Sequence, residues 1–405
     1  MKLTVLLRGQ ITDGGGFNQS LNAILQIKSI VNDLCEVEVV TTHKESIFEL
    51  SKFNIQATYY KLDFLDKLFQ FYIFSKFSKL QKFVKLISPL EKFLISRSAG
   101  LVYFVAPDIL CLTFQRLNYI LTLWDLCHRD HPEFPEVRNY LEFQNREFYH
   151  NQALAKAFFV ITDSHQLSIS ASQQYGVSLT KFISMPFLPS PYFGEELGNK
   201  LPEIILNKKY LFYPAQYWPH KNHIRILQSL LILKKRTKEL PYVVFSGGDK
   251  GNLEYINNYI KVNGLELNVI QMGFVESSVL QSLYAHAFCV IMPTYFGPTN
   301  IPPIEAWLYN KPLIYTSDFK IQVEDAAILV DPDSALEIAN AIEMIEKIAL
   351  REKLIEAGRK RILDLKALRI KAESEIYKKL NAFFRRRECW SSDFNGLVKK
   401  PQKNI

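Results

Sequence analysis

The stretch GPTNIPPIEAWLYNKPLI, residues 297–314, places three prolines, an asparagine and one carboxylate ahead of helix-forming residues. Prolines fix φ and remove backbone donors, so the sequence predicts a rigid loop up to Pro303 and a helix from Ile304 onward. A helix N-terminus has unpaired N–H groups and a partial positive charge, which favour an anion. The carboxylate of Glu305 can instead accept hydrogen bonds from hydroxyl groups. The stretch therefore predicts a site for a ligand that carries both phosphate and hydroxyl groups.

Two other segments have residues suited to a phosphate. DGGGFNQSLN (13–22) puts Gly15 and Gly16 between a strand and a helix, where glycine lets the backbone approach a ligand closely. The same glycines could form only a tight turn, and they do not make the G-x-G-x-x-G fingerprint of dinucleotide sites. In YPAQYWPHKN, Lys221 stands where a helix opens and could stabilise the charge of a diphosphate leaving group. The alternative for Lys221 is an ordinary solvated lysine.

The segment LWDLCHRDHPEF (123–134) follows an apolar strand and is dense in ionisable groups. His128 could shuttle a proton or hydrogen-bond a sugar hydroxyl near neutral pH, and Asp125 could orient it or assist an acceptor hydroxyl. The structural alternative is a loop histidine and an aspartate that caps a helix. Ser164, in TDSHQLSIS, is expected first to cap a helix and only second to belong to a site.

These segments must be positioned by strands and helices that alternate along the chain. Residues 2–7, 35–42 and 157–162 read as strands with helical sequence between them, and the pattern restarts after a linker at 184–205 that is rich in Pro, Gly and Ser. Alternation of this kind predicts parallel α/β sheets. At 405 residues the chain is too long for one ordinary core, so two domains are expected, with a ligand cleft between them.

Composition narrows the classes of function. The net charge of +8 favours an anionic partner, but the positive charges are not grouped with base-stacking aromatics in a nucleic-acid module, so no nucleic-acid binding is expected. The five cysteines are scattered without a C-x-x-C pair, which argues against a zinc site or a disulfide framework and for a reducing compartment. The N-terminal apolar run is too short for a signal peptide, and no apolar run is long enough to span a membrane.

The segment 61–98 differs from the rest because it has seven Lys and one Arg interleaved with Phe and Leu. At helical spacing these residues make an apolar face flanked by cations. This pattern is typical of a surface helix that docks on an anionic bilayer. It also fits an ordinary amphipathic helix packed on its own domain.

The second half of the chain resembles the retaining glycosyltransferases of the GT-B fold, known as group 1 or family 4. AQYWPHKN lies on the family's Gly-Arg…Lys pattern, with Lys221 on the diphosphate lysine and Gln216 in the arginine position. GPTNIPPIEA matches the family's two-glutamate loop from its asparagine onward. Glu305 is the second glutamate, usually on the nucleotide ribose, whereas Gly297 replaces the first. VVFSGGDKG, MGFV and LVDPDSALEIANAI also stand where the family expects them, and LWDLCHRDHPEF carries part of an H-D-L-x-H-like stretch.

The resemblance implies two Rossmann-like domains that face each other across a cleft, with a C-terminal helix crossing back to the first. We expect an acceptor domain at 1–195, a nucleotide-sugar domain at 196–370 and a returning helix and tail at 371–405. The predicted catalytic residues are Lys221, His128 and Asp125. The predicted donor-binding residues are Gly15, Gly16, Gln216, Gly248, Val275, Thr299, Asn300, Ile301 and Glu305. No metal ion and no cofactor are expected, because Lys221 and backbone amides would neutralise the diphosphate.

The implied reaction transfers a sugar from a UDP or GDP sugar to a hydroxyl of a glycan or a lipid-linked oligosaccharide, with retention of the anomeric configuration. The implied setting is bacterial surface polysaccharide assembly, in the cytoplasm or at the inner face of the cell membrane. Two rivals stay open. The same fold hosts nucleotide-sugar epimerases, and Gln216 and Gly297 would suit a non-catalytic partner subunit.

Overall fold

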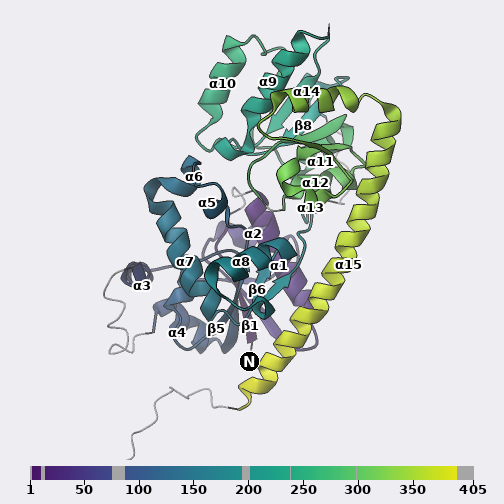
Figure 1. The fold of residues 1–405 in the computed structure, drawn as a ribbon. Coiled ribbons are helices and arrows are strands. Elements are labelled where there is room, and N and C mark those ends of the chain that lie inside the picture. The colour runs from purple at the N-terminus through teal and green to yellow at the C-terminus, as the bar shows by residue number, and fades with distance from the viewer. Residues whose placement is uncertain are drawn as a thin grey trace, which may run out of the picture.

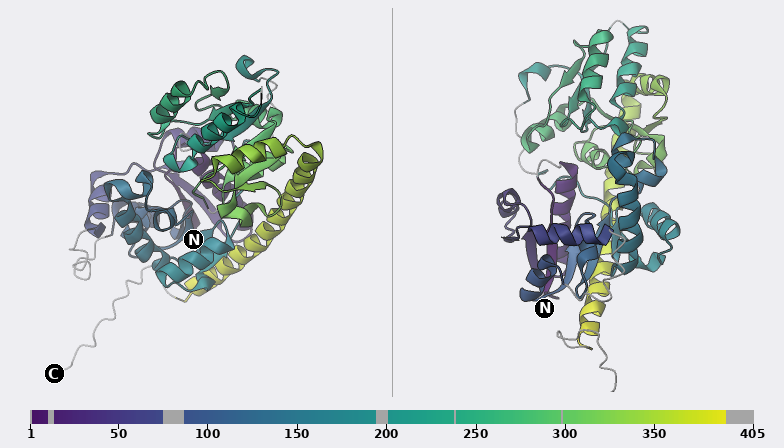
Figure 2. Two further views of the ribbon diagram at one scale, coloured as in Figure 1. Left: turned by 45° about the horizontal axis from the view of Figure 1, so that its top comes forward. Right: turned by 90° about the vertical axis from the view of Figure 1, so that its left-hand side faces the viewer.

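The structure is a computed structural model that describes residues 2–10, 14–74, 87–193, 201–237, 239–297 and 299–389. Within these ranges the chain forms two domains, each built on a parallel sheet, and a long helix runs along the side of both (Figure 1). The predicted α/β class is therefore confirmed. Figure 2 shows the two domains stacked end to end, with the same helix beside them.

The sheet of the first domain has the strand order β3-β2-β1-β4-β5-β6-β7, and all its pairs are parallel. Its strands are β1 (Lys2–Leu7), β2 (Glu36–Thr41), β3 (Ala57–Tyr59), β4 (Ala99–Phe104), β5 (Asn118–Leu123), β6 (Val160–Thr162) and β7 (Phe182–Ser184). The helices are α1 (Gly15–Ile30), α2 (Glu45–Ser51), α3 (Phe64–Phe74), α4 (Pro89–Ser96), α5 (Cys127–Asp130), α6 (Pro135–Arg138), α7 (Glu142–Lys156) and α8 (His165–Tyr175).

The central position of β1 in the sheet explains why its sequence, KLTVLL, is almost entirely apolar after Lys2. Leu3, Val5 and Leu7 belong to the core on one face of the sheet, whereas Leu6 belongs to the core on the other face. A strand of a parallel sheet is covered on both faces, so apolar residues at consecutive positions are all buried.

The sheet of the second domain has the order β10-β9-β8-β11-β12-β13, again parallel throughout. Its strands are β8 (Tyr210–Pro214), β9 (Tyr242–Ser246), β10 (Val269–Gln271), β11 (Cys289–Met292), β12 (Leu313–Thr316) and β13 (Ile328–Val330). The helices are α9 (His223–Lys234), α10 (Leu253–Val262), α11 (Ser277–His286), α12 (Ile301–Leu308), α13 (Lys320–Val323) and α14 (Ala335–Met344).

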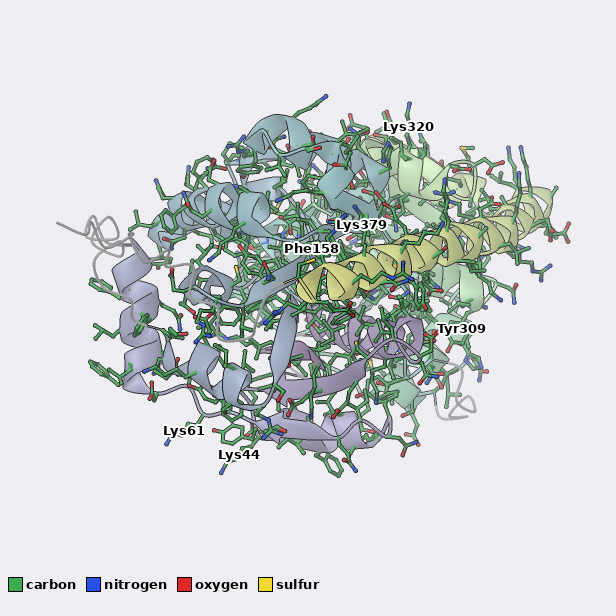
Figure 3. All side chains as sticks on the ribbon, turned by 90° about the horizontal axis from the view of Figure 1, so that it is seen from below. Lys44, Lys61, Phe158, Tyr309, Lys320 and Lys379 are labelled. Carbon is green, nitrogen blue, oxygen red and sulfur yellow. The ribbon has the colours of Figure 1, made fainter. Side chains whose placement is uncertain are left out.

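The last helix, α15 (Ile348–Arg387), ties the two domains together. Leu354 and Leu365 are buried in the core of the second domain, whereas Ile376 and Leu380 are buried in that of the first. Figure 3 shows the helix crossing the molecule and ending near Phe158, whose ring centroid lies 5.0 Å from that of Phe383. The predicted crossing helix is confirmed, and the predicted boundary at residue 371 lies inside this single continuous element.

One sequence expectation was wrong. Helix α12 begins at Ile301 rather than Ile304, with Pro302 and Pro303 in its first turn. The N–H groups of a first turn have no partner inside the helix, so prolines are tolerated there. The strands β3 and β7, each three residues long, and β4 were not anticipated, because such short or uniformly apolar runs have no clear period.

Candidate active site

The predicted phosphate-binding segments all follow strands at the points where the strand order reverses. The glycine loop follows β1, whose neighbours β2 and β4 lie on opposite sides, and Lys221 follows β8, which lies between β9 and β11. Asn300 follows β11. In open α/β sheets the carboxyl ends of strands at such reversals form the ligand crevice. The topology therefore puts each segment at the ligand-binding edge of its own sheet.

Lys221 ends a short 3-10 turn, Pro219–Lys221, directly before α9. Its backbone oxygen accepts a hydrogen bond from the hydroxyl of Tyr213 at 2.7 Å, and its Nζ lies 3.4 Å from Oδ1 of Asn300. Burial lowers the pKa of the Lys221 ammonium to about 8, against the opposing effect of nearby acidic groups such as Asp125. The ammonium is thus held in a desolvated position where a bound anion would favour its charged form.

Asn300 organises the loop that carries it. Its Nδ2 donates to the hydroxyl of Tyr315 at 2.8 Å and to the Gly297 oxygen at 3.0 Å, and its backbone N–H donates to Oε1 of Gln322 at 2.9 Å. Gly297 has φ +98°, and a Cβ there would lie 2.7 Å from Oδ1 of Asn300. The fold therefore requires glycine where the resembling family has its first glutamate.

Glu305 is buried on the inner side of α12, with 6% of its surface exposed. Its carboxylate accepts hydrogen bonds from the backbone N–H of Ser190, 3.2 Å away, and from the hydroxyl of Tyr284, 2.6 Å away. Burial raises its pKa to about 7, opposed by these two hydrogen bonds. In this state both oxygens have partners inside the protein, so the role of Glu305 on ribose stays a prediction.

The glycine loop of the first domain lies directly against the second domain. A Cβ on Gly14 would lie 3.4 Å from Nε2 of Gln216, and one on Gly15 would lie 3.3 Å from Cδ1 of Ile301. A Cβ on Gly16 would lie 3.2 Å from the Trp124 ring. The structure thus brings together Gly15, Gln216 and Ile301, which come from three separate parts of the sequence.

A carboxylate that the sequence did not single out also reaches this loop. Asp163, directly after β6, accepts a hydrogen bond from the hydroxyl of Thr299 in the other domain and one from the Ser164 hydroxyl at 2.9 Å. Burial raises the pKa of Asp163 to about 7, although both hydrogen bonds oppose the shift. Ser164 itself caps α8 by accepting from the N–H of Leu167, as expected. The signal for Asp163 was its place at the end of a parallel strand.

A second contact between the domains was also missed. Glu136, on α6, accepts hydrogen bonds from the backbone N–H of His220 at 3.1 Å and from its ring Nδ1 at 2.6 Å. The His220 ring stacks on Phe296, with 4.3 Å between centroids. Burial lowers the pKa of His220 to about 4, so the ring is neutral while it donates to Glu136. This contact holds the residues that flank Lys221 against the first domain.

The remaining predicted donor residues, Gly248 and Val275, follow strands β9 and β10 of the second domain. Gly248 follows β9, and its oxygen accepts from the N–H of Tyr217 at 3.0 Å. A Cβ at Gly248 would have no neighbour within 4 Å. Val275 follows β10 and packs, partly buried, against the core of the domain. Their part in binding a nucleotide stays a prediction.

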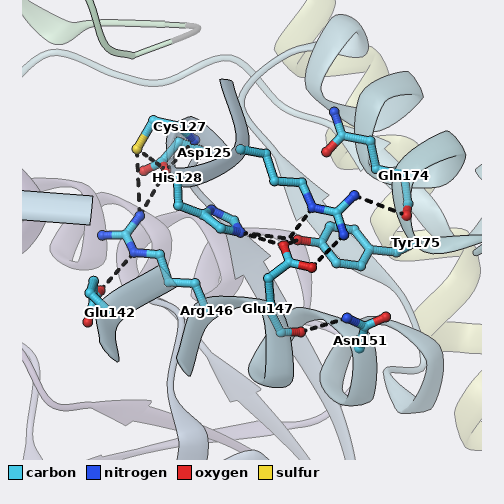
Figure 4. A network of polar contacts seen from close by, with 10 residues as sticks. Asp125, Cys127, His128, Glu142, Arg146, Glu147, Asn151, Gln174 and Tyr175 are labelled. Atoms are coloured by element: carbon cyan, nitrogen blue, oxygen red, sulfur yellow. Dashed lines mark hydrogen bonds and ion pairs between the residues drawn. The ribbon is translucent and has the colours of Figure 1, made fainter. Parts of the chain in front are cut away.

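The two residues predicted on the acceptor side are neighbours that contact different partners (Figure 4). Nη1 of Arg146 lies 3.2 Å from Asp125. Burial raises the pKa of Asp125, but Arg146 and hydrogen bonds from Cys127 outweigh it and hold the pKa below its ordinary value. His128 instead is fully buried, with Nε2 2.9 Å from Glu147, and burial lowers its pKa. Asp125 is partly exposed beside a cavity of about 330 Å³ that it lines, whereas His128 is not among the lining residues.

The described ranges also bear on metal binding and on membrane spans. No three His, Cys, Asp or Glu side chains there are placed so that they could hold a metal ion. In the same ranges no helix is both long and apolar enough to cross a bilayer.

Comparison with curated proteins links the chain to two bacterial sequences. It is 23% identical over 184 residues to the uncharacterized glycosyltransferase YqgM of Bacillus subtilis, covering 44% of this chain and 50% of YqgM. It is 22% identical over 255 residues to the O-antigen chain mannosyltransferase RfbU of Salmonella typhimurium, covering 61% of this chain and 67% of RfbU. The chain therefore matches only half of the length of YqgM and about two thirds of that of RfbU.

Comparison with solved structures extends the likeness over both domains. The crystal structure of Anabaena HepE in complex with UDP-glucose superposes with a TM-score of 0.66 at 17% identity, covering 96% of this chain and all of HepE. At that identity the match shows the shared fold. The family model described as "Glycosyl transferases group 1" matches residues 200–361, which hold Lys221, Asn300 and Glu305. The second domain thus matches the group 1 glycosyltransferases, and the chain has the GT-B fold.

Proposed function

We propose that the protein is a retaining glycosyltransferase that moves a sugar from a UDP or GDP sugar to a hydroxyl of a glycan or lipid-linked oligosaccharide in bacterial surface polysaccharide synthesis. The observation that carries the proposal is the position of Lys221, a desolvated ammonium that follows β8 and lies 3.4 Å from Asn300, next to the Ile301 that faces Gly15 of the glycine loop. A diphosphate placed between them would meet the ammonium and the N-terminus of α1. RfbU is named as a mannosyltransferase of the O-antigen chain, and HepE was solved in complex with UDP-glucose. Together they support a nucleotide-sugar donor and a surface polysaccharide as the product.

In this proposal Lys221 and the amides near Gly15 and Asn300 stabilise the charge that develops on the departing diphosphate. The acceptor hydroxyl attacks the sugar on the face from which the diphosphate leaves, and the diphosphate takes up the hydroxyl proton. No protein nucleophile and no metal ion take part. Glu305 would exchange one internal hydrogen bond for the ribose hydroxyls.

A transfer assay tests the proposal. Purified protein is mixed with UDP-glucose, UDP-galactose, GDP-mannose or UDP-N-acetylglucosamine and a lipid-linked oligosaccharide extract, and nucleotide release is measured with and without acceptor. Release that needs the acceptor, is lost in Lys221→Ala, and gives a product with the donor's anomeric configuration by NMR would support it. Conversion of the donor without acceptor would favour an epimerase. Absence of both nucleotide binding and release would favour a non-catalytic partner, the reading that Gln216 and Gly297 suit.

We further propose that α3 docks the protein on an anionic membrane. Phe64 and Phe71 on this helix are 75% and 73% exposed, and Leu65 and Leu68 are half-exposed. The helix lies at the outer edge of the first domain (Figure 1), anchored by buried Asp66. The middle of the basic segment 61–98, residues 75–86, lies outside the described residues. A phenylalanine that leaves water gains about 1.5–3 kcal/mol, so two of them give measurable attachment.

Vesicle sedimentation tests this second proposal. With vesicles of phosphatidylglycerol and phosphatidylethanolamine, the double variant Phe64→Ser/Phe71→Ser should lose at least about tenfold in binding, the equivalent of one lost aromatic anchor. Phe48→Ser, which removes a 66% exposed phenylalanine on α2, is the matched control and should bind as wild type. Equal binding by all three proteins would refute the docking role of α3.

A further inference from the structure

The cavity of about 330 Å³ in the first domain lies at the carboxyl ends of β4 and β5, against one side of α7. Its lining includes Asp108, Trp124, Asp125, Glu142, Arg146 and His150. The volume is in the range of small-ligand sites, and the lining joins one aromatic ring to several polar groups. We propose, on the basis of the proposed function, that this cavity is the acceptor subsite and that it takes an uncharged, hydroxyl-rich sugar ring rather than a phosphorylated one.

The charged side chains of the lining determine which kind of ligand fits the cavity. Arg146 donates through Nε to Glu142 at 2.7 Å, and its Nη1 lies 3.2 Å from Asp125. Asp108 lies 2.7 Å from Nη1 of Arg8. Among the described lining residues, Arg146 is thus shared between two carboxylates, and no lysine lines the cavity. A phosphate would meet several carboxylates and no uncommitted cation, which is unfavourable.

The histidine of the cavity adds no positive charge. Burial lowers the pKa of His150 to about 3, and the neighbouring His128 and Arg146 act in the same direction, whereas Asp125 and Glu147 oppose it. His150 is 4% exposed, and its Nδ1 has no hydrogen-bond partner among the described residues. The ring is therefore neutral at physiological pH and leaves one ring nitrogen without a protein partner.

Hydroxyl groups suit this lining better than any ion does. A sugar hydroxyl both donates and accepts, so it can donate to Asp125 or Glu142 and accept from Arg146. The pairing seen in Figure 4 holds these side chains in place before a ligand arrives, which reduces the entropy lost on binding. Trp124 offers an apolar ring surface on which the C–H face of a sugar can pack.

The position of the cavity suits an acceptor. Trp124 lines it and also reaches the glycine loop, where its ring would lie 3.2 Å from a Cβ on Gly16. The adjacent Gly15 faces Ile301 at the start of α12. A sugar in the cavity therefore lies on the first-domain side of the proposed donor site, one tryptophan away from it.

Binding of simple sugars tests the inference without any transfer reaction. Saturation-transfer NMR would measure the affinity of wild type, Arg146→Met and Arg129→Met for four sugars. These are methyl α-mannopyranoside, methyl α-glucopyranoside, methyl α-galactopyranoside and mannose 6-phosphate. Arg129 is the control because it also forms an ion pair next to the cavity, with Glu147 of α7, the helix that carries Arg146. Arg129 itself does not line the cavity. Arg146→Met should weaken the best neutral glycoside at least about tenfold, the equivalent of one charge-assisted hydrogen bond, while Arg129→Met should not.

Asn145→Lys keeps the inference testable if loss of Arg146 harms folding. Asn145 is an exposed residue of the lining, so a lysine there adds a free cation without breaking a pair. Wild type should bind the neutral glycosides more tightly than mannose 6-phosphate, and Asn145→Lys should reverse or remove that preference.

The outcomes separate this inference from the proposed function. Tighter binding of the phosphorylated sugar by wild type, or equal effects of Arg146→Met and Arg129→Met, would overturn it. A protein that binds UDP or GDP but none of the glycosides would also overturn it and leave the donor proposal standing. Glycoside binding that depends on Arg146 in a protein that binds no nucleotide would uphold the cavity and refute the donor proposal.

Discussion

The pH dependence of nucleotide binding tests the assignment of Lys221 to the diphosphate. The free protein holds this ammonium with a pKa of about 8, because burial disfavours its charge. A bound diphosphate would favour the charged form and raise the pKa, so binding must take up a proton whenever the free lysine is neutral. The affinity is then full well below pH 8 and falls as the pH rises through the pKa of the free lysine.

The size of the effect follows from the same pKa. Between pH 7.5 and pH 9 the protonated fraction of a group with a pKa of 8 falls roughly eightfold, so the Kd for UDP or GDP should rise by about the same factor. The last phosphate proton leaves near pH 6, so the charge of the nucleotide hardly changes in this range. His220, with a pKa of about 4, stays neutral throughout.

Isothermal titration calorimetry of UDP and GDP at four pH values between 7.5 and 9, at constant ionic strength, provides the measurement. Lys221→Arg is the matched control, because a guanidinium stays charged and should show a flat profile over this range. That control also measures any contribution from Glu305 and Asp163, whose pKa values lie near 7. A wild-type profile as flat as that of Lys221→Arg would show that the reasoning about Lys221 is wrong.

Three further predictions concern stability and the contact between the domains. Gly247→Ala would place a Cβ 2.2 Å from a backbone oxygen, so it should cost about 3 kcal/mol and lower the Tm by roughly 6–12 °C, while Gly248→Ala, with nothing within 4 Å, should not change it. Because burial raises the pKa of Glu305 from 4.5 to about 7, its stabilising contribution is full below pH 4.5 and is lost as the pH rises to 7. Relative to Glu305→Gln, wild type should therefore lose up to about 3 kcal/mol between pH 5 and pH 8 in thermal melts, and a constant difference would contradict this. Glu136→Ala leaves two donors of largely buried His220 without their acceptor, costs the interface about 1–3 kcal/mol, and should enlarge the radius of gyration in X-ray scattering; an unchanged radius would argue against a role in closure.

Part of the candidate site was readable from residue type and order alone. The alternation of apolar strands with helical sequence predicted two parallel α/β domains, because parallel strands buried on both faces are nearly continuous apolar runs, as in β1. The place of Lys221 and Asn300 directly after strands was also readable, since ligand sites of such sheets lie where strands end. The start of α12 was misplaced by three residues, because proline forbids the interior of a helix but not its first turn.

Contacts between distant segments were decided only by the tertiary structure. Asp163 and Thr299 are 136 positions apart, and Glu136 and His220 are 84 apart, so no local pattern could pair them. From the sequence, Asp125 and His128 were equally good candidates, since both belong to one ionisable stretch. Packing of α7 beneath that stretch turned His128 inward to Glu147 and left Asp125 at the cavity with Arg146. Sequence determines which groups are available, but burial and the domain interface determine which of them meet and what charge each one holds.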